Sequence, residues 1–393
     1  MLNQYYWPGV EATGQLLTDL CEALAEDCDV TVITGALPKA PGGGKGARNG
    51  VRIIRVRSTA FDRRRLALRG LNYVTFVSLA LGAGVRLPRP DAVVCMTDPP
   101  FLGTFAYAVA RRFRVPLVVI SQDVFPEIAV ELGRLRNPLA VRLLAALVEF
   151  QLSHADRVVA IGETMRTRLE TKGVAPARID VIPNWVDVEA ISPRAKRNGW
   201  SEANGLADCF VVMHSGNVGH AQDLDALLHA ASLLCDLAEL RIVIVGSGAR
   251  HAELVHLARR LELENVLFLP YQPRDVLSDS LSAGDVHVVG LAQGLSGFVV
   301  PSRVYGILAA GRPLIASAEA SSETAQLVEE IGCGVTVPPG RPPELAAAIR
   351  SAYSGELDLD AMGRRARAYA ESEATREVAV QRYRSLLDRA ITG

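Results

Sequence analysis

The stretch VPSRVYGILAAGRPLIA, Val300 to Ala316, predicts a short helix, a stop and a strand, the repeating unit of an α/β fold. Ser302 is placed to cap the helix, because its hydroxyl can accept from an amide one turn further on. Gly311 allows a left-handed exit and Pro313 prevents continuation, so that LIAS follows as a short apolar strand.

The residues around this predicted helix also suit an anion. Amides and the dipole at a helix start attract phosphate, and Arg303 adds a forked cationic group in the first turn. Upstream, GLAQGLSGF contains Gly294 and Gly297, which let backbone approach a ligand closely. A diphosphate site and an ordinary αβ connection are both compatible with these residues.

The bulk composition limits the class of protein. The chain has 393 residues, enough for two or three domains at roughly 150 residues each. A net charge of -1 argues against a general nucleic-acid binder. The six cysteines are scattered without a CxxC, which favours small buried residues in a reducing cytoplasm over disulfides or metal ligands. Met1 leads directly into LNQYYWPG, so we expect no signal peptide.

Strand-like apolar runs alternate with helical patterns along the chain, which predicts an α/β protein. The predicted strands are LNQY, DVTVIT, VRIIRV, DAVVCM, PLVVIS, RVVAI and IDVI, then CFVVMHS, LRIVIVG, NVLFLP, DVHVVG and PLIAS. This alternation predicts two doubly wound domains, which would bind ligands at the carboxyl ends of their strands and in the cleft between them.

Composition also predicts the boundaries. A first domain covers 1–186, a polar, turn-rich linker 187–207, a second domain 208–370, and a final segment 371–393 contains an amphipathic helix, Glu371–Asp388. PKAPGGGKG, Pro38–Gly46, predicts a flexible surface loop.

Two stretches of the first domain carry candidate chemistry. In YYWPGVEATGQLL, Gly9 loosens the backbone where a helix begins, and Glu11 and Thr13 can face the cleft. Thr13 can equally cap that helix. In PLVVISQDVFPEIAVELG, Asp123 lies two residues past an apolar strand, where a carboxylate can take a proton from a hydroxyl. Alternatively, Asp123 or Glu127 caps the helix that follows.

The second domain repeats this strand, glycine turn and helix. In HSGNVGHAQDLDALL, the turn residues Gly216, Asn217 and Gly219 can aim amides at an anion, and His220 either donates to it or is a surface residue.

Two further turns of the second domain could contact a nucleoside. IVIVGSGARHAEL supplies Gly246, Ser247 and Gly248, although GSG is not the dinucleotide fingerprint GxGxxG. NVLFLPYQPRDVL places Tyr271 and Gln272 just past a strand, where an aromatic ring either stacks on a base or covers the sheet edge.

Residues 61–90 combine a basic cluster with an apolar run. FDRRRLALRGLNYVTFVSLALGAGVRLPRP contains six arginines against one acid, Asp62. Its apolar part, Leu71–Val85, is shorter than the ~20 residues that span a bilayer. Either an interfacial helix attracted to anionic lipid or a buried helix with a basic flank fits the pattern.

Several of these stretches together resemble glycosyltransferase family 4, retaining enzymes with the GT-B fold. They are YYWPGVEATGQLLTDL, VIPNWVD, HSGNVGHAQDLDALL, VGSG and VPSRVYGILAAGRPLIA, and they cover nearly the whole chain. VIPNWVD looks like the interdomain motif, with Trp185 where glycine is usual. The chain looks most like the bacterial surface-polysaccharide branch, typified by L-fucosamine and related N-acetyl-sugar transferases.

The resemblance implies two Rossmann-like domains facing a central cleft, with a nucleotide-sugar donor, UDP-linked in this branch, held mainly by the C-terminal domain. Asp123 and Arg303 are then the expected catalytic residues. The expected donor diphosphate site is Gly9, Gly216, Asn217, Gly219, His220, Gly297, Phe298, Ser302 and Arg303. The expected nucleoside site is Gly246, Ser247, Gly248, Tyr271 and Gln272, and the expected acceptor site is Glu11, Thr13 and Glu127.

The resemblance also implies partners and location. The expected acceptor is a lipid-linked saccharide, and the expected product is a surface polysaccharide such as O-antigen or capsule. The enzyme would be cytoplasmic and peripheral on the inner face of the cell membrane, which residues 61–87 would contact. No metal or other cofactor is expected, and the last helix would cross back to the first domain.

The chain departs from the family at two positions. Many relatives carry two glutamates around the helix quoted first, with seven residues between them; alignment on AAGRP puts Phe298 and Gly306 there. The second glutamate normally holds the nucleotide ribose. The first touches the donor sugar, a contact that backbone amides of Gly297 and Phe298 could replace. His220 stands where relatives often carry Lys or Arg, so Arg303 would carry more of the phosphate charge.

Three other functions remain compatible with the sequence to different degrees. A non-hydrolysing nucleotide-sugar epimerase shares the two-domain fold and needs no acceptor. An inactive carbohydrate- or nucleotide-binding homologue is compatible with the missing glutamates. A NAD-dependent dehydrogenase fits less well, since no GxGxxG opens a βαβ unit.

Overall fold

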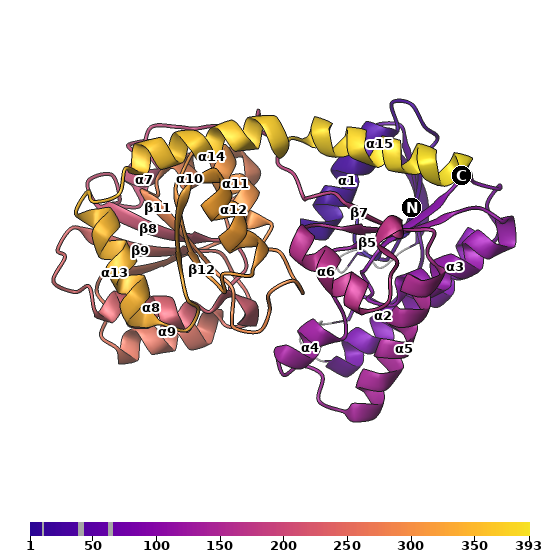
Figure 1. Cartoon of the computed structure of the whole chain (residues 1–393), viewed down its shortest axis with the longest axis horizontal. Helices are drawn as coiled ribbons and strands as arrows, with labels where there is room; N and C mark the ends of the chain where they lie inside the picture. The colour runs from indigo at the N-terminus through magenta and orange to yellow at the C-terminus, as the bar shows by residue number, and fades with distance from the viewer. Residues whose placement is uncertain (10–11, 38–42, 62–65) are drawn as a thin grey trace. The chain divides into compact units, whose positions relative to one another are not determined.

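The computed structural model describes residues 1–9, 12–37, 43–61 and 66–393 (Figure 1). The chain divides into two compact units. Unit 1 contains Met1–Asn184, Gly297–Val299 and Arg376–Gly393, and unit 2 contains Trp185–Ser296 and Val300–Thr375.

Unit 2 is built on a six-stranded parallel sheet. Its strands are β8 (Phe210–Ser215), β9 (Leu240–Val245), β10 (Val266–Leu269), β11 (Val286–Gly290), β12 (Leu314–Ser317) and β13 (Gly334–Val337). Their order is β10-β9-β8-β11-β12-β13, and every neighbouring pair is parallel. This is the doubly wound order, in which successive strands are added toward one edge from β8 to β10 and toward the other edge from β11 to β13. Such sheets bind ligands at the switch point between these two halves, here between β8 and β11.

Helices cover both faces of this sheet (Figure 1). They are α7 (Gly199–Ala203), α8 (Leu224–Ser232), α9 (His251–Arg260), α10 (Leu277–Ser282), α11 (Arg303–Ala309), α12 (Glu323–Ile331), α13 (Pro342–Tyr353) and α14 (Leu359–Glu373). One apolar core lies between the sheet and α8, α9 and α13, and another between the sheet and α11, α12 and α14. Four of these strands, β8, β9, β11 and β12, are buried on both faces, which explains the continuous apolar runs from which they were predicted.

Unit 1 has a similar sheet in two hydrogen-bonded parts. Its strands are β1 (Thr31–Thr34), β2 (Gly44–Arg48), β3 (Val51–Arg55), β4 (Val93–Met96), β5 (Leu117–Ser121), β6 (Arg157–Ala160) and β7 (Ile179–Val181). The orders are β1-β3-β2 and β4-β5-β6-β7, parallel except for β2 against β3. Leu2 forms parallel bridges to both Ile33 and Cys95, so the predicted first strand LNQY is reduced to one bridging residue that joins β1 to β4.

The helices of unit 1 follow the same alternation. They are α1 (Ala12–Leu24), α2 (Leu66–Gly84), α3 (Leu102–Phe113), α4 (Glu127–Glu131), α5 (Pro138–His154), α6 (Glu163–Thr171) and α15 (Arg376–Thr392). α15 packs against α1, and Arg384 donates to the carbonyl of Ala23 on α1 at 3.0 Å. The two units together confirm the predicted fold class of two Rossmann-like α/β domains.

Two local expectations were wrong, and a third is tested only in part. The single helix expected at Glu371–Asp388 is two, because α14 ends at Glu373 and α15 begins at Arg376, while Thr375 forms a bridge to Val186. Residues 187–207, expected to be a linker, belong to unit 2 and contain α7, which Asn198 caps. In the glycine-rich loop at Pro38–Gly46, residues 38–42 lie outside the described part of the chain, but residues 44–46 begin β2.

The basic–apolar segment at residues 61–87 forms α2. Asn72, Phe76, Val77 and Ala80 are buried, and α2 packs against α3 and β1, as expected of a core helix. Residues 62–65, with three of the arginines, lie outside the described residues. Among the helices that are described, α2 included, none is both long and apolar enough to cross a bilayer.

Candidate functional site

Arg303 lies at the topological switch point of the unit 2 sheet, between β8 and β11. Its guanidinium Nη2 donates to the carbonyl of Gly290 at the end of β11, at 2.8 Å. A Cβ added at Gly216, just past β8, would lie 3.5 Å from Arg303 Cδ. Arg303 therefore lies at the carboxyl ends of β8 and β11, where a doubly wound sheet binds its ligand.

The guanidinium of Arg303 is poorly compensated. Burial lowers its pKa to about 10, and no acidic group contributes to that value. Its Nε atom is buried without a hydrogen-bond partner among the residues that the structure describes. Arg303 remains protonated at pH 7 but has lost much of its hydration, so an anion bound here would restore the missing interactions.

His214 is a second buried polar group at this position, which the sequence analysis did not identify. It precedes Ser215 in β8 and is fully buried, with Nε2 3.3 Å from the carbonyl of Asn217. Burial, followed by the charge of Arg303, lowers its pKa well below the usual value. His214 is therefore neutral at pH 7, and the positive charge lies on Arg303.

The glycine turn after β8 uses its amides internally. The amide of Gly216 donates to Val245 O at 2.9 Å, and that of Gly219 donates to Gln222 Oε1 at 2.9 Å. The expectation that these two amides point at an anion is therefore not met in this conformation. Asn217 and His220 are exposed, which agrees with the surface alternative for His220.

The GSG turn after β9 is explained by packing. A Cβ at Gly246 would lie 1.9 Å from Gly216 O, and one at Gly248 would lie 2.2 Å from Val218 O. The amide of Val218 donates to the carbonyl of Ser247 at 2.9 Å. These two glycines are required for the close contact between the two turns, whatever else the GSG turn does.

Tyr271 and Gln272 follow the edge strand β10 and differ in availability. Tyr271 is exposed and can stack on a planar group. Gln272 accepts from Trp200 Nε1 at 2.9 Å and donates to Pro270 O at 2.7 Å, so its side chain is already bound.

The stretch that opens the sequence analysis forms the elements predicted for it. α11 ends before Gly311, which has φ +65°, and β12 follows Pro313. The predicted cap is wrong: Ser302 has helical dihedrals, and in the structure its side chain accepts from no amide of α11. Backbone that is already helical at this position leaves the hydroxyl outside capping geometry.

Gly297 and Phe298 belong to unit 1, unlike Ser302 and Arg303. Gly297 has φ +77°, and a Cβ there would lie 2.8 Å from both Arg168 Cγ and Thr164 O. The Arg168 guanidinium lies 4.5 Å from the centre of the Phe298 ring. The segment thus packs on α6, and the carbonyl of Phe298 accepts from Val124 just past β5.

Gly306, at the position of the second family glutamate, lies in apolar surroundings. The side-chain atoms nearest to an added Cβ would be Leu281 Cδ1 at 3.7 Å and Ile191 Cδ1 at 3.8 Å. Because glycine has no side chain, Gly306 cannot make the side-chain contact with the ribose that the family glutamate makes.

Asp123 lies past the end of β5 in unit 1, as predicted, and forms an antiparallel bridge with Val299. Burial, followed by the nearby charge of Asp98, raises its pKa to about 7, while Arg69 acts in the opposite direction. A carboxyl group that titrates near neutral pH can both accept and release a proton.

Asp98 is the acidic residue of this site that the sequence analysis missed. It follows β4, which pairs with β5, so the two aspartates lie past the carboxyl ends of neighbouring strands. Thr13 Oγ1 donates to Asp98 Oδ2 at 2.7 Å, which explains the place of Thr13 better than the cap that we considered. Arg69 donates to the Tyr73 hydroxyl at 2.6 Å.

The remaining predictions in unit 1, Glu127 and Glu11 for the acceptor and Gly9 for the donor diphosphate, fare differently. Glu127 pairs with Lys172, whose Nζ lies 2.6 Å from Glu127 Oε1, so this carboxylate already has a cationic partner. The amide of Gly9 donates to Tyr6 O in a turn at 3.0 Å. Glu11 lies outside the described residues. No group of three or more His, Cys, Asp or Glu side chains in the described ranges could hold a metal ion.

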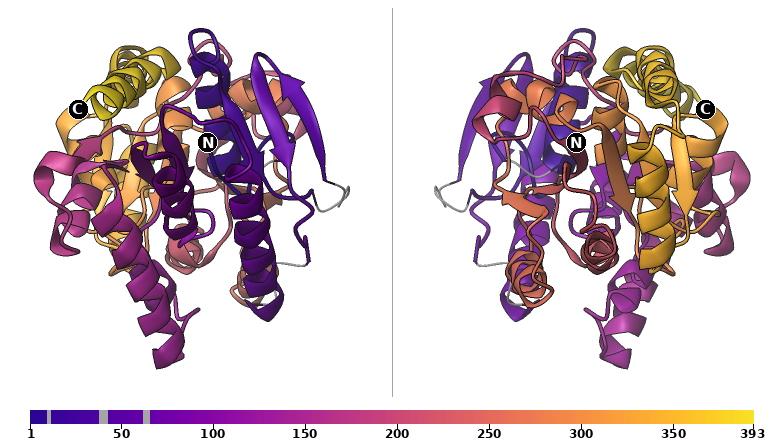
Figure 2. Two further views of the ribbon diagram at one scale, coloured as in Figure 1. Left: turned by 90° about the vertical axis from the view of Figure 1, so that its right-hand side faces the viewer. Right: turned by 90° about the vertical axis from the view of Figure 1, so that its left-hand side faces the viewer.

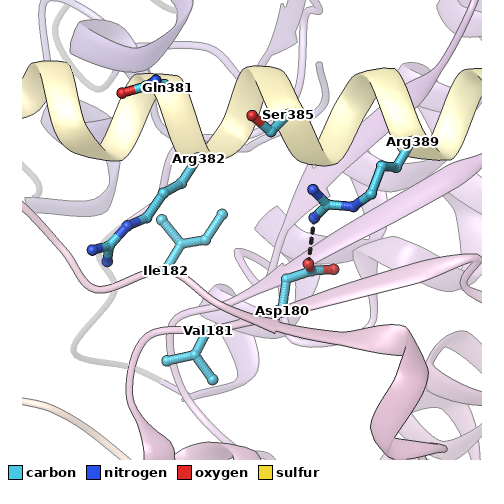
Figure 3. Close-up of a pocket in the computed structure, with 7 residues that line it drawn as sticks. All are labelled: Asp180, Val181, Ile182, Gln381, Arg382, Ser385 and Arg389. Atoms are coloured by element: carbon cyan, nitrogen blue, oxygen red, sulfur yellow. Dashed lines mark hydrogen bonds and ion pairs between the residues drawn. The ribbon is translucent and has the colours of Figure 1, made fainter.

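Two pockets lie away from these residues. One of about 340 Å³ in unit 1 lies between the end of β7 and α15, where Arg389 and Asp180 pair at 2.7 Å (Figure 3). The other, of about 570 Å³ in unit 2, lies past β12 and β13 and is lined by Glu319 and Arg341 among others. Neither is lined by a residue predicted for the site.

Comparison with known proteins identifies the class. Residues 12–185 match the family "Glycosyl transferase 4-like domain", and residues 197–369 match "Glycosyl transferases group 1". The probable glycosyltransferase WbjE of Pseudomonas aeruginosa is 31% identical over 313 residues, 77% of this chain and 76% of WbjE. The putative colanic acid biosynthesis glycosyl transferase WcaI of Escherichia coli is 29% identical over 302 residues, 75% and 73% of the two chains.

Solved structures share the fold. Anabaena Alr3699/HepE in complex with UDP-glucose has a TM-score of 0.75 and 18% identity, over 99% of this chain and 98% of HepE. Sucrose-phosphate synthase from Thermosynechococcus elongatus has a TM-score of 0.79 and 18% identity, over 98% and 95%. The protein is a glycosyltransferase with the GT-B fold. Specifically, the chain belongs to glycosyltransferase family 4, with a 4-like N-terminal domain and a group 1 C-terminal domain.

Proposed function

We propose that the enzyme is a retaining transferase that moves an N-acetylamino sugar from a UDP-linked donor to a lipid-linked saccharide. The product would be a cell-surface polysaccharide such as O-antigen or capsule. The proposal depends on the environment of Arg303. Its guanidinium is desolvated, has no acidic partner among the described residues, and lies at the topological switch point of the unit 2 sheet.

The relatives support the choice of donor and pathway. WcaI is named for colanic acid biosynthesis, and the solved structures include HepE in complex with UDP-glucose. A nucleoside diphosphate also suits the chemistry, because its β-phosphate becomes the leaving group and matches a forked cation.

In the proposed reaction, the bond between the sugar C1 and the β-phosphate oxygen breaks first, and negative charge grows on that oxygen. Arg303 stabilises this charge, which for one preorganised donor is worth about 3–4 kcal/mol of barrier. His214, neutral beside it, adds no competing charge. The acceptor hydroxyl then attacks from the side of the leaving group, so the anomeric configuration is kept.

The acceptor proton has two available destinations. The departing phosphate oxygen can accept it directly, and Asp123 can orient the hydroxyl or take the proton. A pKa near 7 suits this second role, because the carboxylate form is populated at neutral pH yet binds a proton readily. Asp98 contributes by raising that pKa.

We further propose that the enzyme works on the inner face of the cell membrane, with residues 61–87 near the lipid, and needs no metal. Arg303 would take the role that a divalent cation plays on a diphosphate. Transfer should then persist in EDTA, and a requirement for added Mg²⁺ or Mn²⁺ would contradict this part of the proposal.

The test of the donor proposal is a thermal-shift series with UDP, GDP, ADP and TDP, followed by UDP-sugars. UDP should raise the melting temperature of the wild type. At a hundredfold excess over Kd, its binding adds roughly 2.7 kcal/mol to the free energy of unfolding. Arg303→Met should abolish this shift. Arg350→Gln removes an exposed arginine of unit 2, which pairs with Asp236, and should leave the shift intact.

Two results would favour other functions. Epimerisation of the UDP-sugar without an acceptor would indicate an epimerase. Absence of binding for all four nucleotides would indicate a homologue without transferase activity. Transfer with retention, read from the anomeric coupling of the product by NMR, supports the proposal.

A further inference from the structure

Residues 297–299 belong to unit 1, although the chain on both sides of them belongs to unit 2. Three residues are too few to bury a core of their own. Their place in unit 1 therefore depends on backbone pairing and on side chains of the neighbouring elements.

The backbone of this segment pairs with the chain just past β5. The amide of Val124 donates to the carbonyl of Phe298 at 2.8 Å, and Asp123 forms an antiparallel bridge with Val299. Residues paired directly across such a ladder carry their Cβ atoms on one face, about 4.5–5.5 Å apart. The apolar side chain of Val299 therefore lies beside the carboxyl group of Asp123, and the pairing fixes the direction of the Asp123 Cα–Cβ bond.

Side chains from α6 support this pairing, which is too short to be stable alone. The guanidinium of Arg168 lies 4.5 Å from the centre of the Phe298 ring, within the range of a cation–π interaction. A Cβ at Gly297 would lie 2.8 Å from both Arg168 Cγ and Thr164 O, so glycine allows the segment to lie this close to α6. Arg168 is therefore the side chain that holds the ring of the segment.

α6 is itself fixed on the sheet that carries Asp123. It packs against β6 and β7, and its residues Met165 and Leu169 are buried. Figure 2 shows α6, in magenta, at the end of unit 1 opposite the violet hairpin of β2 and β3, in agreement with the strand order. β6 pairs with β5, the strand that leads to Asp123. Arg168 thus holds the segment from the same sheet that carries the carboxyl group.

Arg168 differs in its surroundings from Arg166, two residues earlier on the same helix. Arg166 Nε donates to Glu170 Oε1 at 3.0 Å, and its Nη1 lies 3.5 Å from Glu163 Oε2. Both of these partners lie on α6, whereas the Arg168 guanidinium lies over a ring from a distant part of the sequence. Arg166 is therefore a matched control for Arg168.

We propose that Arg168 is a positioning residue for glycosyl transfer. By holding the Phe298 ring, it keeps residues 298–299 paired with the backbone at Asp123, and this pairing sets the place of the Asp123 carboxyl group. Proton transfer needs heavy atoms about 2.6–3.2 Å apart, and a misplacement of about 1 Å can lower a rate about a hundredfold. The inference rests on the proposed function for the role of Asp123, and it deepens that function by naming what aims the carboxyl group at the acceptor hydroxyl.

The raised pKa of Asp123 makes its position measurable. Burial, followed by the charge of Asp98, raises this pKa to about 7, and Arg69 acts in the opposite direction. If residues 298–299 left the end of β5, the Val299 side chain would no longer cover the carboxyl group and water would reach it. The pKa of Asp123 would then fall toward its ordinary value, because desolvation is the largest cause of the shift.

The first test is the carbon-13 carboxyl resonance of Asp123, followed by NMR through a pH titration of the full chain. Its midpoint should lie about 1 pH unit or more lower in Arg168→Ala than in the wild type, and should be unchanged in Arg166→Ala. Phe298→Leu, which removes the ring under the guanidinium, should give the same change as Arg168→Ala. An unchanged midpoint in Arg168→Ala would overturn the proposal, since the contact would then have no effect on Asp123.

The double variant Arg168→Ala, Phe298→Leu shows whether the two side chains act through each other. Because each single change removes the same interaction, the double variant should have the midpoint of either single variant. Two shifts that add would mean that Arg168 acts on Asp123 by a route other than the ring, and would also overturn the proposal. Arg168 is exposed, so Arg168→Ala should keep the melting temperature of the wild type.

The second test measures transfer from UDP-N-acetylglucosamine to a polyprenyl-diphosphate-linked N-acetylglucosamine. Arg168→Ala should lower kcat about tenfold or more at pH 7 without changing KM for the donor, because the Arg303 site is intact. Arg166→Ala should keep the kcat of the wild type. An unchanged kcat in Arg168→Ala would overturn the positioning role, even with a shifted Asp123 midpoint.

The two tests distinguish failure of this inference from failure of the proposed function. A wild type that transfers no sugar and shows no UDP thermal shift contradicts the proposed function, while the Asp123 titration still decides whether Arg168 positions that carboxyl group. A wild type that transfers sugar with retention, together with a normal kcat in Arg168→Ala, leaves the proposed function standing and overturns the inference.

Discussion

Arg303 differs from Arg367, another partly buried arginine of unit 2, in what surrounds it. Arg367 donates to the carbonyls of Ile191, Ala309 and Val188 and pairs with Glu371. Among the residues that the structure describes, Arg303 has one hydrogen-bond partner, the carbonyl of Gly290. A desolvated charge without a counter-ion weakens the fold, so its presence indicates a purpose other than stability.

The substitution Arg303→Met should therefore separate stability from function. Replacing an uncompensated, desolvated charge with an apolar side chain of similar length should raise the melting temperature of the ligand-free protein. The same change should lower kcat by about a hundredfold to a thousandfold, as expected for loss of one preorganised donor to a developing anion. A melting temperature below that of the wild type would show that Arg303 has a structural role instead.

Asp123 predicts a specific dependence of stability on pH. Its pKa is about 7 in the folded protein, against about 3.9 in an unfolded chain. Between these values the folded state holds a proton that the unfolded state has lost, so the free energy of unfolding falls as pH rises from about 4 to about 7. Asp123→Asn should make the curve flatter in this window, measured by urea denaturation at a series of pH values.

Asp98→Asn tests the cause of that shift. Without the charge of Asp98, the pKa of Asp123 should fall, so the decline in stability should end at a lower pH than in the wild type. A direct check is the carbon-13 carboxyl resonance of Asp123, followed through the same titration. If its midpoint is unchanged in Asp98→Asn, then burial alone accounts for the raised pKa.

Among the residues of the candidate site, the sequence predicted the ones that lie next to an apolar strand. It missed the ones whose role depends on contacts between distant parts of the chain. Asp123 and Arg303 stand out because each lies next to a recognisable strand or turn. Asp98 lies in an Asp-Pro-Pro sequence without a recognisable motif, and its effect on Asp123 and its hydrogen bond with Thr13, 85 residues away in the sequence, appear only in the fold. His214 lies inside an apolar strand and becomes visible only through its position beside Arg303.

At the scale of elements, periodicity predicted most strands and failed for two. β2 has the sequence GKGAR, which contains no large apolar residue, and all but its last residue are exposed. It is an edge strand held by its antiparallel ladder with β3 rather than by burial. β13, GVTV, is only four residues long and begins with Gly334, so its apolar signal is weak.

The turns after β8 and β9 form one packed unit, and this makes a prediction for Gly246. Gly246 has φ +140°, and a Cβ there would lie 1.9 Å from Gly216 O. Gly246→Ala should destabilise the protein by roughly 3 kcal/mol or more, since the backbone of both turns must move. It should also weaken the UDP thermal shift, because Gly216 adjoins Arg303.

Gly205→Ala is the matched control for this prediction. Gly205 also has a positive φ, +67°, but no other described atom lies within 4 Å of an added Cβ. It should lose only the backbone term, about 1–2 kcal/mol, and keep the UDP shift. Equal losses in the two variants, measured by urea denaturation, would show that backbone strain rather than close packing fixes Gly246.

At the scale of the whole molecule, each unit has its own sheet and its own core, yet the chain crosses between them more than once. Unit 1 is completed by the last eighteen residues and unit 2 by the segment before them. Composition alone predicted two domains and a final helix. It could not reveal the break between α14 and α15, because that break depends on the bridge between Thr375 and Val186.

α15 should therefore stabilise unit 1 selectively. Leu386 is fully buried on α15, whereas Ile391, further along the same helix, is exposed. Leu386→Ala should cost roughly 2–5 kcal/mol, as expected for a cavity in a core, and Ile391→Ala about 0.5 kcal/mol or less. Calorimetry with and without UDP identifies which transition belongs to unit 2, because only that transition should move with the ligand. We expect Leu386→Ala to lower the other transition while the UDP-sensitive one stays in place. A variant that lowers both transitions equally would mean that the two units unfold as one cooperative body, and that α15 stabilises the entire chain.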